Sequence, residues 1–159
     1  MASISLEVAR DADAARIAGM SRWLIEHGLK WSWTPERVAR HVRCGDSVVL
    51  VAREEYQLKG FAIMYFADTS AHLSLLAVMP RCQRRGIGQR LVRWLEESAL
   101  VAGTFSVSLE VRARNWPARR FYRHLGYADT GVARLYYGGC EDAIRMSRDL
   151  RVCRSANMC

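Results

Sequence analysis

The segment from residue 76 to residue 89, LAVMPRCQRRGIGQ, carries residue types that can bind a phosphate group. Its first part is predicted to end a strand at Met79 and Pro80, and a helix is predicted to begin within residues 86–88. The first N–H groups of a helix have no partner inside the helix, and glycines there let a ligand approach the backbone. A strand, a glycine turn and a helix in this order predict a phosphate cradle, whereas two glycines alone would also fit a plain tight turn.

Two common phosphate motifs are absent from this segment. A Walker loop needs a lysine followed by serine or threonine, and neither lysine of the chain, Lys30 or Lys59, has such a neighbour. A dinucleotide-binding fingerprint needs a third glycine at position 91, which is Leu91 here. The region still favours an anionic ligand, because five arginines fall within thirteen residues: Arg81, Arg84, Arg85, Arg90 and Arg93.

Glu110 and Tyr122 belong to two residue types whose side chains could move protons, as do other glutamates and tyrosines of the chain. The strand predicted over Ser106–Arg112 alternates apolar and polar residues, which places Glu110 on its polar face. A carboxylate at this place can accept a proton, and a tyrosine hydroxyl can donate one. The structural alternatives are an ion pair between Glu110 and Arg112 and a core position for Tyr122 beside Phe121.

Five cysteines are present, but their pattern indicates neither a metal site nor a disulfide framework: Cys44, Cys82, Cys140, Cys153 and Cys159. Their number is odd, no C-x-x-C pair occurs and the four histidines are scattered, so no metal is expected. Cys82 and Cys140 are the conceivable nucleophiles of a covalent intermediate. No histidine lies in a motif beside either of them, so a covalent route through a cysteine is disfavoured.

Length and composition define the class of protein. A chain of 159 residues, half of them hydrophobic and a quarter charged, predicts one globular domain over residues 1–150 and a flexible tail at residues 151–159. The apolar runs are far shorter than the roughly 18 residues of a membrane-spanning helix. No signal peptide is recognisable, so a cytoplasmic protein without a membrane partner is expected. The net charge of +8 would suit a nucleic-acid-binding module, but no nucleic-acid-binding motif accompanies it, and nucleic acid is not the expected partner.

The elements that must position these residues follow from periodicity and from helix and turn signals. Seven strands are predicted, at residues 4–8, 47–53, 59–68, 72–79, 106–112, 127–133 and 143–148. Four helices are predicted: from Asp11 or Asp13 to about residue 27, from Thr34 onward, over residues 86–101 and over residues 117–125. The order βααβββαβαββ predicts a mixed α/β sheet with helices on both faces.

Two motifs make the chain resemble a known superfamily. Residues 83–88, QRRGIG, match the Q/R-x-x-G-x-G/A motif of the GCN5-related N-acetyltransferases (GNAT). Residues 115–127, NWPARRFYRHLGY, resemble that superfamily's N-x-x-A-x-x-F/L-Y-x-x-x-G-F/Y segment, about thirty residues downstream. Residues 109–112, 115–126 and 136–144 are most similar to the bacterial RimI type, the ribosomal-protein alanine N-acetyltransferases. The resemblance runs from about residue 4 to residue 150 and is weaker in the first third.

The resemblance implies the α/β GNAT fold: a mixed, mostly antiparallel, twisted sheet of about seven strands, splayed in the middle, with about four helices on both faces. It implies acetyl-CoA as the cofactor, held by residues of the strand end, the glycine turn and a later asparagine: Leu76, Ala77, Val78, Gln83, Arg84, Arg85, Gly86, Ile87, Gly88, Gln89 and Asn115. It implies that Glu110 is the general base, acting through water, and that Tyr122 protonates the departing thiolate. It also implies that Tyr136 and Tyr137, in a loop at residues 134–139, line the substrate site.

The function implied by the resemblance is acetyl-CoA-dependent transfer of an acetyl group directly to a primary amine, with a protein N-terminal α-amine as the acceptor. The alternatives are N-acetylation of a small amine, such as a polyamine, amino acid or drug, and, more remotely, a basic nucleic-acid-binding module. A degenerate acyl-CoA-binding domain without catalysis is disfavoured by the presence of Glu110, Asn115 and Tyr122. The expected partner is the amine acceptor, and the chain is expected to be a monomer or a homodimer.

Overall fold

The computed structural model describes residues 3–152, so residues 153–159 of the expected tail, with Cys153 and Cys159, lie outside the described residues. The described chain divides into two compact units. The first contains residues 3–65 and 73–98, and the second contains residues 66–72 and 99–152. A single domain over residues 1–150 therefore stays a prediction.

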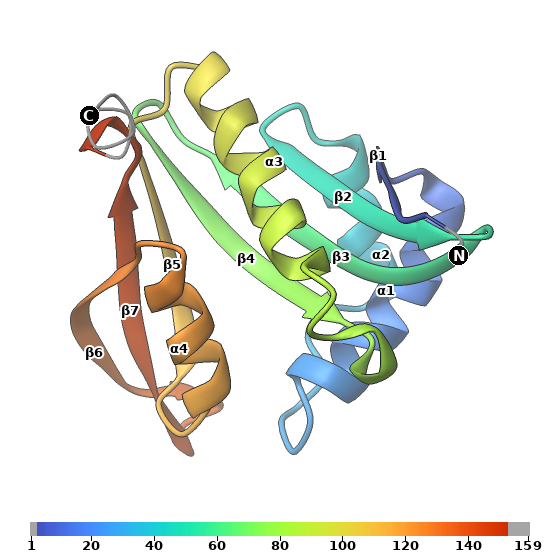
Figure 1. Cartoon of the computed structure of the whole chain (residues 1–159). Helices are drawn as coiled ribbons and strands as arrows, with labels where there is room; N and C mark the ends of the chain where they lie inside the picture. Colours follow the sequence, from blue (N-terminus) through green and yellow to red (C-terminus); the bar gives the residue numbers. More distant parts are fainter. Residues whose placement is uncertain (1–2, 153–159) are drawn as a thin grey trace. The chain divides into compact units, whose positions relative to one another are not determined.

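The first unit consists of a sheet with helices on both faces (Figure 1). Its strands are β1 (Ser5–Val8), β2 (Ser47–Glu54), β3 (Gln57–Phe66) and most of β4 (Ser70–Val78). Its helical elements are η1 (Asp11–Asp13), α1 (Ala14–Met20), the π-helical turn η2 (Ser21–Ile25), α2 (Pro35–Arg43), the 3-10 turn η3 (Pro80–Cys82) and most of α3 (Ile87–Val101). The helices α1 and α2 cover one face of the strands and α3 covers the other, as predicted (Figure 1).

The core of the first unit follows from the two-residue period of its strands. Val49 and Val51 of β2 are almost fully buried, and they belong to one hydrophobic cluster with Ile17 of α1. The alternate residues Leu50 and Ala52 are fully buried as well, and they point toward the opposite face, which α3 covers. A strand buried on both faces reads as a continuous apolar run, which is how β2 appears in the sequence.

The strands β2 and β3 form the predicted antiparallel hairpin, and two residues other than glycine make its turn. Glu55 and Tyr56 both have positive φ values, 50° and 69°. Two positive φ values in a two-residue connection belong to a type I′ turn, whose twist matches that of the flanking strands. The sequence indicates a turn here but not its type, because the usual Asn-Gly signal is missing.

A buried glutamate organises the segment between α1 and α2. The helix predicted to reach about residue 27 widens at η2, where the Glu26 N–H donates to the carbonyl of Ser21 at 2.8 Å. Glu26 is buried, and its carboxylate accepts hydrogen bonds from the Ser21 hydroxyl at 2.9 Å and from the Ser32 N–H and hydroxyl at 2.7 Å each. The Trp33 N–H donates to the same carboxylate at 3.3 Å. This side chain therefore provides the acceptors that the backbone of an irregular segment requires.

The second unit contains the start of β4 and the last three strands. Residues Ser70 to His72 of β4 pair in parallel with the first residues of β5 (Ser106–Arg112), and His72 lies opposite Ser108. The strand β7 (Glu141–Asp149) pairs with β5 and with β6 (Ala128–Tyr137), antiparallel to both. The helix α4 (Trp116–His124) joins β5 to β6. The hydrogen-bonded order β1-β2-β3-β4-β5-β7-β6 confirms the predicted seven-stranded, mostly antiparallel sheet.

The strand β6 is longer than predicted, which corrects the assignment of residues 134–139 to a loop. β6 continues to Tyr137, and the turn to β7 contains Gly138 and Gly139, which have φ values of 62° and 72°. The register between β6 and β7 shifts between Ala133 and Tyr137, and Leu135 within that stretch has a φ of 51°. This irregularity breaks the alternation from which strands are recognised, so the sequence pattern ends too early.

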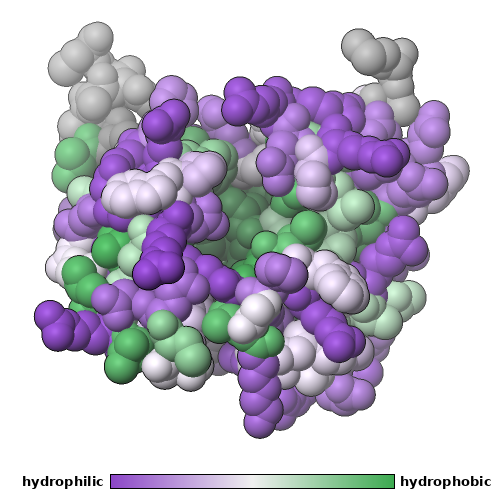
Figure 2. Space-filling view, turned by 90° about the horizontal axis from the view of Figure 1, so that it is seen from below, coloured by the Kyte–Doolittle hydropathy of each residue, from purple (hydrophilic) through white to green (hydrophobic). Residues whose placement is uncertain are grey.

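Hydrophilic side chains are spread over the face shown in Figure 2, in line with the quarter of the residues that are charged. Within residues 3–152, no helix combines the length and the apolar character needed to cross a membrane.

The ion pair between Arg53 and Asp13 joins β2 to η1 and is little exposed. Arg53 Nη2 lies 2.6 Å from Asp13 Oδ2, with 12% and 11% of the two side chains exposed, and Arg53 also donates to Glu7 of β1. Burial acts to raise the pKa of Asp13, but hydrogen bonds from Arg53 and from the Arg10 N–H outweigh it and hold this pKa below its ordinary value.

Replacing Arg53 by Met is expected to lower the free energy of unfolding by about 1–3 kcal/mol, because Asp13 loses a charged partner while it stays largely buried. Urea denaturation at pH 7 measures this loss. The pKa of Asp13 is lowered in the folded state, so the ion pair stabilises above the unfolded-state pKa and its effect fades as the pH falls through the folded-state pKa. The difference in the free energy of unfolding between Arg53→Met and the wild type should therefore become smaller at acidic pH.

The pair of Arg43 with Asp11 provides the matched control. Its atoms lie 3.1 Å apart, but 68% and 57% of its side chains are exposed. Arg43→Met should cost less than about 1 kcal/mol. Equal losses in the two variants would contradict the role assigned to burial.

Candidate functional site

The predicted phosphate loop lies in the first unit, between β4 and α3. After η3 the chain passes through Arg84 and Gly86, which both have positive φ values of 64° and 78°. α3 begins at Ile87, and the carbonyl of Gly86 accepts its hydrogen bond from the Arg90 N–H at 3.0 Å. Ile87 is buried under the loop, whereas Gly88 and Gln89 are partly or fully accessible in the first turn. The helix thus begins where the sequence predicts, with its first N–H groups beside the glycine loop.

The loop is open on the side of Gly86. A Cβ atom placed on Gly86 would meet no other atom within 4 Å among the described residues. Gln83 joins the loop to the end of β4, because its Nε2 donates to the carbonyl of Val78 at 3.2 Å. Leu76 and Ala77 lie just before that carbonyl, the first half-buried and the second buried. Open space beside a helix N-terminus and exposed basic residues fit a phosphate-bearing cofactor.

The five arginines of this region are less free than the sequence suggests. Three of them already donate to oxygens of the first unit: Arg85 to Glu54, Arg90 to the carbonyl of Ile4, and Arg93 to Glu96. Arg84 is exposed and lies within the loop itself. Arg81 is exposed as well, but it lies in η3, before the loop, so among the loop residues themselves Arg84 is the exposed arginine outside these three contacts.

In the second unit, Glu110 on β5 contacts side chains from two other strands. His72 Nε2 of β4 lies 2.5 Å from Glu110 Oε2. Arg145 of β7 is directly opposite Glu110, and its Nε lies 3.9 Å from Oε1. Arg112, the partner considered from the sequence, donates to Glu141 at 3.3 Å, and its pairing with Glu110 stays a prediction.

Sequence reasoning missed His72. Its contact with Glu110 depends on the parallel pairing of β4 with β5, two strands separated by α3 along the chain. Single-strand periodicity shows which face a residue occupies, but it does not give the register between strands distant in sequence.

Tyr122 lies on α4 and is buried. Its ring packs edge-on against Phe121 and Tyr127, with ring centroids 5.2 Å and 5.8 Å away. The Tyr122 ring therefore occupies the core position that the sequence offered as an alternative. Burial raises the pKa of Tyr122, with a smaller contribution from Tyr137, so the hydroxyl keeps its proton at neutral pH. A protonated hydroxyl is the form that a proton donor requires.

Tyr136 and Tyr137 end β6 in contact with each other, ring centroids 4.9 Å apart and nearly perpendicular. Burial, and then Tyr136 and Glu110, raise the pKa of Tyr137. The guanidinium of Arg112 lies 5.6 Å from the centroid of the Tyr137 ring. Tyr136 is 49% exposed, which leaves part of its ring accessible to a ligand.

Asn115 has a structural role at the start of α4. Its Oδ1 accepts the N–H of Ala118 at 3.2 Å, which is a helix N-cap. The side-chain carbonyl is thereby engaged, and the amide NH₂ group is the part that could contact a ligand.

The predicted residues thus fall into two groups, one in each unit. The first unit holds the loop, the start of α3 and the end of β4. The second unit holds Glu110, Asn115, Tyr122, Tyr136 and Tyr137. Tyr137 interacts electrostatically with both Glu110 and Tyr122.

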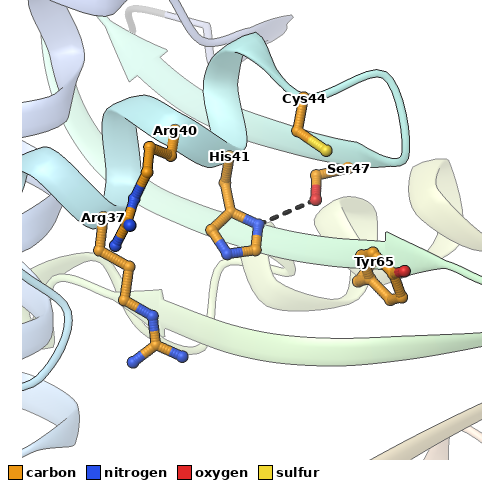
Figure 3. Close-up of a pocket in the computed structure, with 6 residues that line it drawn as sticks. All are labelled: Arg37, Arg40, His41, Cys44, Ser47 and Tyr65. Atoms are coloured by element: carbon orange, nitrogen blue, oxygen red, sulfur yellow. Dashed lines mark hydrogen bonds between the residues drawn. The ribbon is translucent and has the colours of Figure 1, made fainter.

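A cavity of about 330 Å³ in the first unit contains none of the predicted residues (Figure 3). It lies at the end of α2 and is lined by Arg37, Arg40, His41, Cys44, Ser47 and Tyr65. His41 Nδ1 and Ser47 Oγ are hydrogen-bonded at 2.8 Å. Burial, and then the charges of Arg37 and Arg40, lower the pKa of His41, so its imidazole is neutral at pH 7.

Comparison with known proteins defines the class of this protein. Residues 17–127 match the model of the acetyltransferase (GNAT) family. This segment contains the loop before α3, Glu110 and Tyr122. The chain belongs to the GNAT family, as its motifs predict.

The chain is similar to other N-acetyltransferases, one of them named for an alanine of a ribosomal protein. A ribosomal protein bS18 alanine N-acetyltransferase of Salmonella typhimurium is 37% identical over 94 residues, which cover 57% of this chain and 64% of that protein. An uncharacterised N-acetyltransferase of Methanocaldococcus jannaschii is 36% identical over 97 residues, which cover 60% of this chain and 62% of that protein. The chain therefore matches less than two thirds of the length of these relatives.

Solved structures show the same fold over most of the chain. The ribosomal-protein-S18-alanine N-acetyltransferase of Escherichia coli has a TM-score of 0.78 and 26% identity, covering 93% of this chain and 94% of that one. Ard1 from Thermoplasma volcanium has a TM-score of 0.83 and 23% identity, covering 92% and 97%. The expected fold and the similarity to the RimI type are both confirmed.

Proposed function

We propose that this protein is an acetyl-CoA-dependent N-acetyltransferase that transfers the acetyl group directly to a primary amine, the α-amine of a protein N-terminus. The observation that carries the proposal is the open loop at the start of α3, which lies inside the segment that matches the family. Its N–H groups, the exposed Arg84 and the positive end of the helix dipole suit the pyrophosphate of the cofactor.

Acetyl-CoA supplies the acetyl group in this proposal, and the side chains of the second unit handle the protons. Glu110 accepts, through a water molecule, the proton that the acceptor ammonium loses before it attacks the thioester carbonyl. The C–N bond would form and the C–S bond would break, and the hydroxyl of Tyr122 would give its proton to the departing sulfur. The second proton that the nitrogen loses as it becomes an amide would restore the Tyr122 hydroxyl. These proton transfers are general acid–base steps between correctly placed groups.

The acceptor class rests on Tyr136, on the chemistry of amines and on the relatives. The partly exposed ring of Tyr136 offers an apolar face and a hydroxyl to an extended peptide. An α-amine has a pKa of about 8, against about 10.4 for a lysine side chain, so more of it is neutral at pH 7 and a carboxylate base suffices. The Salmonella typhimurium relative is named for an alanine of a ribosomal protein, which supports the same acceptor class here.

A cytoplasmic location is part of the proposal. The cysteines of the described chain, Cys44, Cys82 and Cys140, are free thiols, as is usual for proteins of a reducing compartment.

A panel of acceptors is expected to rank peptides with free N-termini above other amines. Release of CoA and the mass of the product would be measured for short peptides with free or acetylated N-termini, each with and without lysine, and for spermidine and free amino acids. Faster turnover of spermidine or of a blocked, lysine-containing peptide would overturn the protein-N-terminus assignment. Absence of transfer to every amine would overturn the enzyme assignment itself.

A further inference from the structure

His72 lies closer to the carboxylate of Glu110 than Arg145 does. His72 Nε2 is 2.5 Å from Oε2, whereas Arg145 Nε is 3.9 Å from Oε1. The Arg145 side chain is 55% exposed, so solvent screens its charge, and the longer separation exceeds that of a hydrogen bond. His72 is therefore the side chain that fixes the orientation of this carboxylate.

The backbone arrangement explains why the two side chains meet. His72 is paired in parallel with Ser108 of β5, and Glu110 follows Ser108 by two residues on the same face of that strand. The side chain of Glu110 is only 16% exposed, so it has given up most of its contact with water. A carboxylate in such a position needs hydrogen-bond donors from the protein, and bonds to a charged group are among the strong ones.

The direction of the hydrogen bond follows from the chemistry of the two groups. An ionised carboxylate has no hydrogen to give, so His72 Nε2 carries the hydrogen and donates it. The bond occupies Oε2 and leaves Oε1 as the oxygen that can receive another proton.

We infer that His72 is a positioning residue for proton removal, holding Oε2 of Glu110 so that Oε1 faces the acceptor amine or its water. This inference rests on the proposed function. The proton lost by the ammonium moves to Oε1, no other bond changes in this step, and His72 keeps its own hydrogen throughout. A glutamate side chain without this hydrogen bond would adopt other orientations as well, and a misplaced catalytic group lowers the rate of the reaction.

Two substitutions at position 72 separate positioning from simple support of the sheet. His72→Leu removes the donor, and kcat for a peptide acceptor is expected to fall about 10- to 100-fold, the range for a lost hydrogen bond to a charged group. The KM for acetyl-CoA should not change. His72→Gln places an amide NH₂ at a similar reach and is expected to restore most of kcat. His124→Leu, at an exposed histidine of α4, is the control and should keep the wild-type kcat.

A spectroscopic measurement tests the contact without any turnover. In protein labelled with ¹⁵N-histidine, the Nε2–H of His72 is expected to give a downfield, slowly exchanging proton resonance. That signal should vanish in Glu110→Ala, while urea denaturation shows whether the variant still folds.

Each outcome separates the inference from the proposed function. Wild-type kcat in His72→Leu, or equal losses in His72→Leu and His72→Gln, would overturn the positioning role while acetyl transfer stands. If the wild-type protein does not give the Nε2–H resonance of His72, the contact between His72 and Glu110 is overturned. A wild-type chain that acetylates no amine would overturn the proposed function, and the positioning role with it, even if the resonance is present.

Discussion

Tyr122→Phe is expected to lower kcat about 100- to 10,000-fold, the range for loss of a general acid, with little change in the affinity for acetyl-CoA. The variant removes only the hydroxyl, so the ring keeps its contacts with Phe121 and Tyr127. Because burial raises the pKa of Tyr122, the wild-type hydroxyl is protonated throughout the neutral range and available as a donor. Steady-state kinetics with a peptide acceptor, together with thermal shifts by acetyl-CoA, measure the two effects separately.

Two other tyrosines serve as comparisons for this variant. Tyr127→Phe removes a hydroxyl from the same buried aromatic cluster and is expected to keep kcat within a few-fold of wild type. Tyr137→Phe is the sharper comparison, because burial raises the pKa of Tyr137 as well and its hydroxyl is also protonated. If Tyr137→Phe takes the large loss in kcat and Tyr122→Phe does not, the donor has been assigned to the wrong tyrosine.

Gly86→Val is expected to abolish the stabilisation of the protein by acetyl-CoA. The valine side chain would occupy the open space beside the start of α3, where the pyrophosphate is proposed to bind. For the wild type, a ligand at about 100 times its dissociation constant adds about 2.7 kcal/mol to the free energy of unfolding. Thermal denaturation with increasing acetyl-CoA measures this difference directly.

Backbone strain requires its own control, because Gly86 has a φ of 78° and a branched residue is strained there. Gly103 follows α3 and has a φ of 84°. A Cβ atom placed on Gly103 would likewise meet no other atom of the described chain within 4 Å. Gly103→Val should therefore lower the melting temperature of the free protein to a similar extent and keep the full response to acetyl-CoA. A normal response in Gly86→Val would show that the loop is a turn and no more.

Elements with strong local signals could be predicted from the sequence. The strand at Ser106–Arg112 agrees residue for residue, because its alternation is strict and one face is fully buried. The helix α2 begins after Thr34, whose Oγ1 accepts the N–H of Arg37 at 3.3 Å, and Pro35 fills the first helical position. In these cases the residues that specify the element lie within it.

Features that depend on distant partners could not be predicted in this way. The widening of the first helix at η2 follows from the inward turn of Glu26 toward Ser32, six residues further on. The end of β6 depends on a shifted register with β7, and the contact of His72 with Glu110 depends on strand pairing across α3. The roles of the predicted site residues remain predictions, since a motif states which residue types are present and not what they touch.

The buried carboxylate of Glu26 also determines how the segment before α2 would meet another molecule. This carboxylate accepts hydrogen bonds from Ser21, Ser32 and Trp33. The indole N–H of Trp31 donates to the carbonyl of Ala18 at 3.2 Å. The segment is thus ordered in the free protein, and its tryptophans are held in place without a ligand. A preorganised aromatic segment loses little conformational entropy on contact, so more of its interaction energy is retained as affinity.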